Sequence, residues 1–143
     1  MKPSRSSFIK YLITVQDHIK EAVMLIDIEY GNKFRLLIAN RAFHNITGYE
    51  TGCVGKELSE FISPGRYKIL KKQYDKVIQS KQPLEYTTWA DVPAGRRAYE
   101  IDVIPVLGVA NSVVQVIVLA RDITKFAKIK EEVQVLRATR YSK

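Results

Sequence analysis

The sequence has few of the residues that build disulfides and metal sites. It contains one cysteine, Cys53, and two histidines, His18 and His44. One cysteine cannot form a disulfide within the chain, and a structural zinc site needs a cluster of cysteines and histidines that this sequence lacks. We therefore expect no metal site, and we expect the chain to be cytoplasmic, where thiols stay reduced.

Long apolar runs are also absent. A transmembrane helix needs about 18 to 20 consecutive apolar residues, and no such run occurs. The first residues do not form a signal peptide either, because Lys10, Asp17 and Lys20 interrupt their apolar positions. We expect no membrane segment in this chain.

The signatures of common enzymes are missing as well. The sequence contains no nucleophile elbow, no phosphate-binding glycine loop, no zinc motif and no plausible catalytic triad. We therefore expect a regulatory domain without catalytic residues, although the full-length parent can carry a kinase or cyclase domain.

The charge is mostly of one sign. The 23 lysines and arginines exceed the 15 aspartates and glutamates, which gives a net charge of +8. These basic residues are spread along the chain and no DNA- or RNA-binding motif accompanies them. We interpret them as a solvated surface and expect no nucleic-acid partner.

Apolar residues make up 46% of the 143 residues, which is enough for one compact core. In several segments they recur every three or four residues, which predicts helices. The predicted helical segments are residues 7–20, 41–46, a short turn near 58–62, 64–80 and a C-terminal helix from 125. Asn40 and Ser63 are expected to cap the two helices that follow them, because both side chains can accept hydrogen bonds from free backbone amides.

Alternating or β-branched runs predict five strands. These are residues 23–29, 34–39, 84–90, 97–106 and 113–121. Turn residues between the first two strands, and between successive members of the last three, predict hairpins. The last strand is apolar on both faces, so we expect the N-terminal helix to cover its outer face.

Several short motifs occur in an order typical of one family. Residues 38–43 (Ile-Ala-Asn-Arg-Ala-Phe) resemble the strand-to-helix junction of PAS domains, and residues 47–49 and 54–56 resemble the family's small-helix loop. Residues 120–124 (Ala-Arg-Asp-Ile-Thr) resemble the junction at which the last strand becomes the output helix. The sequence is similar to PAS domains from about residue 20 to 124.

The resemblance implies an α+β fold with a PAS-like five-stranded antiparallel sheet and helices over one face. It divides the chain into an N-terminal amphipathic helix (1–20), a PAS domain (21–124) and the start of a C-terminal signalling or coiled-coil helix (125–143). Asn40, Gly48 and Gly55 are structural residues in this interpretation.

The same resemblance guides the cofactor expectations. A flavin photosensor of the family needs a cysteine shortly after the position of Gly55, where this chain has Lys-Glu-Leu-Ser over residues 56–59, so flavin–cysteine photochemistry is excluded by motif. Haem-binding members often take an axial histidine from the long helix, and residues 64–80 contain none, which argues against haem. We interpret Cys53 and His44 as packing residues.

Inward-facing positions line either a ligand pocket or a filled core, two alternatives that the sequence leaves open. The pocket candidates are Phe43, Leu70, Tyr74, Tyr86, Tyr99, Ile101 and Val116. A pocket of this composition suits a small apolar or aromatic ligand.

Asp122 and Thr124 are expected to relay a signal from the sheet to the exit helix. A carboxylate at a strand end can accept hydrogen bonds from the first amides of the helix that follows. The helix then has apolar residues at coiled-coil spacing, namely Phe126, Ile129, Val133 and Leu136. We expect a homodimer that forms through the N- and C-terminal helices.

Two functions are consistent with these features. The first is a sensory module of a signal-transduction protein, such as a two-component system, that detects a small ligand or a partner. It would act through the C-terminal helix on an output domain in the same polypeptide: a histidine kinase, a cyclic-dinucleotide enzyme or a transcription regulator. The alternative is a ligand-free protein-interaction or dimerisation module.

Overall fold

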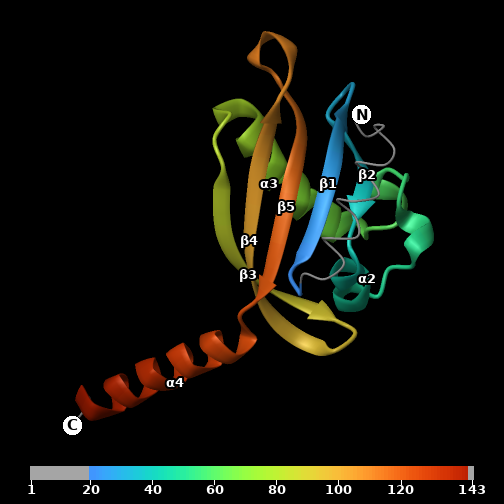
Figure 1. Ribbon diagram of the computed structural model, residues 1–143. Helices are drawn as coiled ribbons and strands as arrows, with labels where there is room; N and C mark the ends of the chain where they lie inside the picture. The colour runs from blue at the N-terminus through green and yellow to red at the C-terminus, as the bar shows by residue number, and fades with distance from the viewer. Residues whose placement is uncertain (1–19, 142–143) are drawn as a thin grey trace, which may run out of the picture.

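A computed structural model of the chain describes residues 20–141 (Figure 1). Five antiparallel strands form one sheet in the order β2-β1-β5-β4-β3. The strands are β1 (Ala22–Glu29), β2 (Lys33–Ala39), β3 (Leu84–Val92), β4 (Gly95–Leu107) and β5 (Val113–Asp122). Because β1 pairs with β5 at the centre, the first and last strands of the domain lie side by side.

The segment between β2 and β3 carries the helices that cover one face of the sheet. It contains α2 (Arg41–Thr47), the single turns η1 (Thr51–Cys53) and η2 (Leu58–Glu60), and α3 (Pro64–Ser80). A further turn, η3 (Val109–Asn111), joins β4 to β5. The last helix, α4 (Thr124–Tyr141), projects away from the sheet (Figure 1).

This architecture confirms the predicted α+β fold. The main difference lies between β3 and β4, where the strands extend further than expected and leave only Pro93 and Ala94 as the turn. Gly95 allows this tight reversal because it adopts φ = 115°, which other residues rarely reach. The expected helix over residues 7–20, and its cover of the outer face of β5, lie outside the described residues.

The core lies between the sheet and the helices. Its largest fully buried side chains include Phe34 on β2 and Tyr74 on α3. Their rings meet edge to face with centroids 5.3 Å apart, a geometry worth about 0.5–1.5 kcal/mol beyond burial. This pair fixes α3 against the β1–β2 side of the sheet.

The side chain of Asn40 joins β1 to α2. Its Oδ1 accepts hydrogen bonds from the amides of Phe43 (3.1 Å) and Val23 (3.0 Å), and its Nδ2 donates to the carbonyl of Glu21 (2.7 Å). Ser63 differs: it precedes α3, but its side chain makes no capping hydrogen bond. Pro64, whose fixed φ suits the first position of a helix, starts α3 without such a cap.

Gly48 and Gly55, which were expected to be structural, both adopt a left-handed backbone. Gly48 ends α2 at φ = 76°, and a Cβ atom there would lie 2.8 Å from Cγ of Pro93 in the β3–β4 turn. Gly55 adopts φ = 91° and donates its amide to the carbonyl of Leu36 (2.7 Å). Gly48 therefore lies against the β3–β4 turn, and Gly55 attaches its loop to β2.

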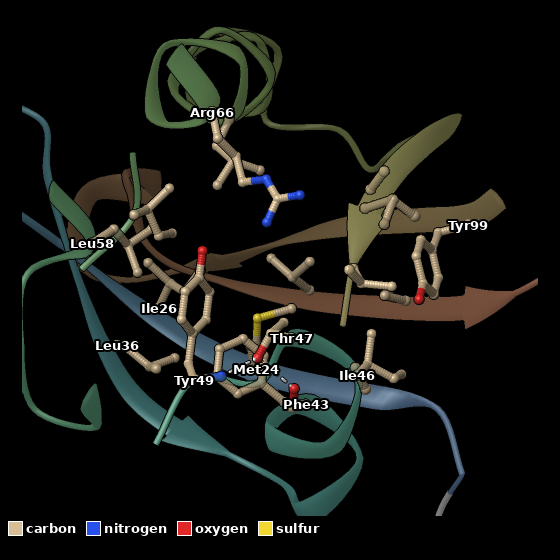
Figure 2. A pocket seen from close by; sticks show the side chains of 18 of the residues that line it. Met24, Ile26, Leu36, Phe43, Ile46, Thr47, Tyr49, Leu58, Arg66 and Tyr99 are labelled. Carbon is tan, nitrogen blue, oxygen red and sulfur yellow. Dashed lines mark hydrogen bonds between the residues drawn. The ribbon is translucent and has the colours of Figure 1, made fainter. Parts of the chain in front are cut away.

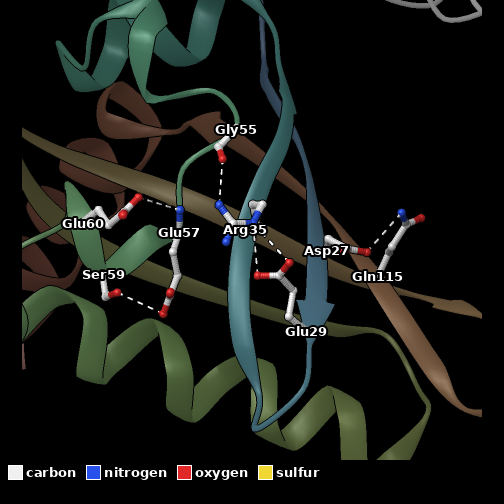
Figure 3. Close-up of polar contacts among 8 residues, drawn as sticks. All are labelled: Asp27, Glu29, Arg35, Gly55, Glu57, Ser59, Glu60 and Gln115. Atoms are coloured by element: carbon white, nitrogen blue, oxygen red, sulfur yellow. Dashed lines mark hydrogen bonds and ion pairs between the residues drawn. The ribbon is translucent and has the colours of Figure 1, made fainter.

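The loop at Gly55 covers the outer edge of the sheet at β2. Arg35 on this strand forms an ion pair with Glu29 on β1 (3.0 Å) and donates from Nη1 to the Gly55 carbonyl (2.8 Å), as Figure 3 shows. The amide of Leu36 adds a hydrogen bond to the Lys56 carbonyl (3.0 Å). The loop thus satisfies backbone groups that an edge strand would otherwise expose.

No helix within residues 20–141 is both long enough and apolar enough to cross a bilayer.

Candidate ligand cavity

A cavity of about 150 Å³ lies between the inner face of the sheet and the helices α2 and α3 (Figure 2). Its wall is almost entirely apolar, with Met24, Ile26 and Leu36 on one side and Ile46 and Leu58 among the covering residues. Apolar cavities of about 150 Å³ accept benzene, whereas drug-sized ligands need about 300 Å³ or more. The space suits a molecule with one ring.

Six of the seven pocket candidates lie on this wall: Phe43, Leu70, Tyr74, Tyr86, Tyr99 and Ile101. The seventh candidate, Val116, is not among the residues of this wall. It points to the same face as Val118, which does line the cavity, but it lies two residues earlier on β5. At about 3.3 Å per residue, this displacement moves its side chain out of the cavity and into the closely packed core, where it is fully buried.

Three alanines explain why space remains at this position. Ala22 and Ala120 are directly opposite each other on β1 and β5, and Ala90 lines the cavity from β3. A larger side chain at any of these inward positions would fill part of the volume. These small residues leave space at inward positions, and only the pairing of the strands brings them together.

Arg66 is the one charged residue among the described residues that line the cavity, and it was not among the predicted pocket residues. Its guanidinium extends from the first turn of α3 into the space (Figure 2). One nitrogen, Nη2, donates to the backbone carbonyl of Asp91 on β3 (3.1 Å). The hydroxyl of Tyr49 points from the opposite wall toward this group (Figure 2).

Tyrosines and Thr47 supply the other polar groups of the described wall. Tyr74 is only 2% exposed, and its hydroxyl has no hydrogen-bond partner among residues 20–141. Burial, helped by the nearby phenol of Tyr86, raises the pKa of Tyr74 far above its ordinary value. Burial also raises the pKa of Tyr86. These hydroxyls stay neutral and can donate to a polar atom in the cavity.

Tyr99 connects the cavity wall to the exit of the domain. Burial and the carboxylate of Asp122 raise its pKa, while Arg97 and Arg66 act in the opposite direction. Tyr99 is also opposite Asp122 in the β4–β5 register. Tyr99, which lines the cavity, is therefore a direct neighbour of the junction between β5 and α4.

That junction is held by hydrogen bonds to Ala98, the residue before Tyr99. The Ala98 amide donates to Oγ1 of Thr124 (2.9 Å), and the Ala98 carbonyl accepts from the amide of Ile123 (2.9 Å). Oδ1 of Asp122 accepts from the Thr124 amide (2.9 Å). Burial alone would raise the pKa of Asp122, but the two hydrogen bonds from Thr124, with the charge of Arg97, hold it below its ordinary value.

Cys53 and His44 do not line the cavity. Cys53 is buried, and burial raises the pKa of its thiol, which makes it a poor nucleophile. Nδ1 of His44 lies 2.9 Å from the backbone carbonyl of Tyr49, so its ring bonds within the short-helix region.

One cluster of carboxylates lies outside the cavity, on β3 and β4. Oxygens of Glu85, Glu100 and Asp102 lie within 4.8 Å of one another. A hydrogen bond with Glu100, and then its negative charge, raise the pKa of Glu85. Arg121 approaches Glu100 at 3.9 Å, so the cluster has neighbours within the chain that reduce its charge.

Comparison with known proteins agrees with this architecture. Residues 17–128 match a family described as the PAS fold. The chain belongs to this family. The PAS domain of BvgS from Bordetella pertussis is similar at 17% identity and a TM-score of 0.67, over 93% of this chain and 98% of that one.

Two further solved structures extend the comparison. A sensory box sensor histidine kinase from Vibrio cholerae shares 15% identity at a TM-score of 0.61, over 83% of this chain and 94% of that one. The LOV protein of Rhodobacter sphaeroides shares 15% identity at a TM-score of 0.62, over 83% of this chain and 68% of that one. At these identities the likeness shows the fold alone. No curated protein matches the chain.

Proposed function

We propose that this PAS domain is the sensory module of a cytoplasmic signal-transduction protein, and that occupancy of the cavity is relayed to α4. The observation that carries the proposal is the continuity from Tyr99 on the cavity wall to Ala98, whose amide and carbonyl both bond to residues at the start of α4. A ligand against Tyr99 displaces β4, and the displacement reaches α4 through Thr124.

Such a relay needs two arrangements of the junction that bind the ligand differently. A ligand shifts their populations only as far as its affinities for the two differ. The hydrogen bonds of Thr124 and Asp122 supply a small set of contacts that can be kept in one arrangement and broken in the other. In this proposal Asp122 and Thr124 act as the relay residues.

The output domain in the same polypeptide is a histidine kinase, a cyclic-dinucleotide enzyme or a transcription regulator. The similarity to a sensory box sensor histidine kinase favours the first. The ligand is not a flavin in this proposal, despite the similarity to a LOV protein, because Lys56 to Ser59 replace the reactive cysteine segment and the cavity volume is about 150 Å³. The same volume argues against haem.

Filling the cavity tests the relay. Ala120→Leu adds a larger side chain to the cavity wall, and we expect it to change hydrogen exchange of the amides at 124–128 by about fivefold or more, equivalent to ~1 kcal/mol. Ala94→Leu, in the exposed β3–β4 turn, is the matched control and should leave these amides unchanged. Unchanged exchange in a folded Ala120→Leu protein would contradict the relay.

A ligand-free dimerisation module is the second candidate, and the exposure of α4 favours it. Phe126 and Leu136 on this helix are 67% and 69% exposed in the isolated chain. Native mass spectrometry separates the two candidates. A bound small molecule that is lost on denaturation supports sensing, whereas a protein that has no such molecule and binds no small-molecule probe supports dimerisation alone.

A further inference from the structure

We propose that the cavity binds a single-ring carboxylic acid, with its carboxylate on Arg66, its ring against Leu70 and its far end toward the hydroxyl of Tyr74. The inference rests on the proposed function, since it names the class of ligand for the same cavity. It follows from the charge, the shape and the unused hydrogen-bonding groups of the wall.

The position of Arg66 favours an anion. It lies in the first turn of α3, where the helix dipole already places positive charge, and no acidic residue occurs in that turn. Arg66 forms no ion pair within the described part of the chain, and its bond to the Asp91 carbonyl uses only Nη2. The remaining N–H donors can bind both oxygens of a carboxylate, for which the guanidinium geometry is well suited.

The face of α3 toward the cavity has a polar group at each end. Arg66, Leu70 and Tyr74 are spaced four residues apart, so their side chains follow one another along one side of the helix. The order is a charged group, an apolar side chain and a hydroxyl. A ligand with an anionic end, an apolar body and a compact polar substituent is complementary to this order.

The size of the cavity limits the apolar body to one ring. A volume of about 150 Å³ matches a benzene-sized guest, and most of the surrounding side chains are apolar. The hydroxyl of Tyr74 is buried and has no partner between residues 20 and 141, so a polar substituent on the ring would satisfy it.

The test compares sodium benzoate with benzamide, which has nearly the same shape but no charge, by isothermal titration calorimetry on the full 143-residue chain. We expect benzoate to bind about tenfold tighter or more, because a charge-assisted pair to Arg66 is lost in benzamide. Arg66→Gln should remove this difference, because glutamine cannot form the charge-assisted pair. Arg66→Lys keeps the charge but not the planar guanidinium, so it should keep part of the preference for benzoate over benzamide.

Lys68→Gln is the matched control, since Lys68 is an exposed cation on the same helix that does not line the cavity. It should leave both affinities unchanged. In a second comparison, 4-hydroxybenzoate should bind tighter than benzoate, and Tyr74→Phe should abolish that gain while retaining benzoate binding. A far-ultraviolet circular dichroism spectrum like that of the wild type shows that Arg66→Gln folds.

Equal binding of benzoate and benzamide would overturn the inference and leave the proposed function intact, because the cavity would still bind a small molecule. Failure of both probes to bind also overturns the inference. In that case, the response of α4 to Ala120→Leu decides separately whether the relay survives.

Discussion

Asn40 and Tyr74 are almost equally buried, yet their polar groups are used very differently. Asn40 is 1% exposed and bonds to residues of both β1 and α2, which makes it part of the framework. Tyr74 is 2% exposed and its hydroxyl has no partner in the described chain. A buried hydroxyl without a partner costs about 1–3 kcal/mol, so Tyr74 lowers the stability of the empty domain.

Tyr74→Phe removes this cost and keeps the ring. We expect the free energy of unfolding to rise by about 1 kcal/mol in urea denaturation of the ligand-free protein. Tyr30→Phe is the control, because Tyr30 is 99% exposed and should not change stability. A less stable Tyr74→Phe protein would show that the hydroxyl has a partner, such as bound water.

The raised pKa of Tyr74 adds a pH dependence with a defined sign. The unfolded chain has an ordinary tyrosine pKa of about 10, so stability is fully present below this pH and is lost as pH rises above it. Tyr74→Phe should therefore lose less stability than wild type between about pH 10 and 11. Denaturation midpoints measured across this range check the prediction.

At the scale of elements, hydrogen bonds join β4, β5 and the start of α4 at one junction. Thr124 is 3% exposed and bonds to Ala98 on β4, while Asp122 at the end of β5 binds the first amide of α4. The carboxylate is stabilised in its charged form. The first turn of α4 is thus held by the sheet, although most of the helix projects from it.

Asp122→Ala should loosen this turn. Loss of a side chain that accepts from a helix N-terminus costs about 0.5–2 kcal/mol, which we expect as faster hydrogen exchange of the amides at 124–127. Asp91→Ala is the control, since Asp91 lies in the β3–β4 hairpin with an exposed side chain. Similar exchange in both variants would argue against a role of Asp122 in holding α4.

Acid should have the same effect on the wild-type junction. Because the folded pKa of Asp122 is lowered, its contribution is present above the unfolded value of about 3.9 and is lost as pH falls through the folded value. Asp122→Asn should remove most of this dependence. Exchange rates corrected for intrinsic pH effects provide the measurement.

At the scale of the whole molecule, α4 leaves apolar side chains in solvent. Phe126, Ile129, Val133 and Leu136 are between 41% and 69% exposed and follow coiled-coil spacing. A second copy of α4 would bury this seam, which is the basis for proposing a homodimer.

Ile129→Glu places a charge in the seam, and we expect it to weaken self-association by about tenfold or more. Val135→Glu is a matched control, because Val135 is 63% exposed but lies outside the seam. Sedimentation equilibrium over a range of protein concentrations measures the self-association of the wild type and of the two variants. A monomeric wild type, or equal disruption by both variants, would contradict dimerisation through this seam.

The element order, the Asn40 cap and the Asp122–Thr124 bond could be predicted because each depends on residues close together in sequence. Helical and strand periods are local, and caps act over three or four residues. Ser63 and the β3–β4 turn show the limit of this reasoning: Pro64 begins α3 without a side-chain cap, and Gly95 permits a shorter turn than composition indicated.

The cavity depended on tertiary structure. Ala22 and Ala120 are far apart in sequence and become neighbours only when β1 pairs with β5, so no local pattern shows the space between them. In the sequence, Arg66 is one of several basic residues on a predicted surface helix, and only the packing of α3 shows that it faces the cavity. Val116 has the apolar character of a pocket residue, and only its position along β5 shows that it does not line the cavity. The sequence by itself therefore determined the family and the exit junction, both of which rest on short-range patterns. The tertiary structure decided that the core contains a cavity and which charged residue lines it, because volume and enclosure arise only from side chains that distant strands and helices bring together.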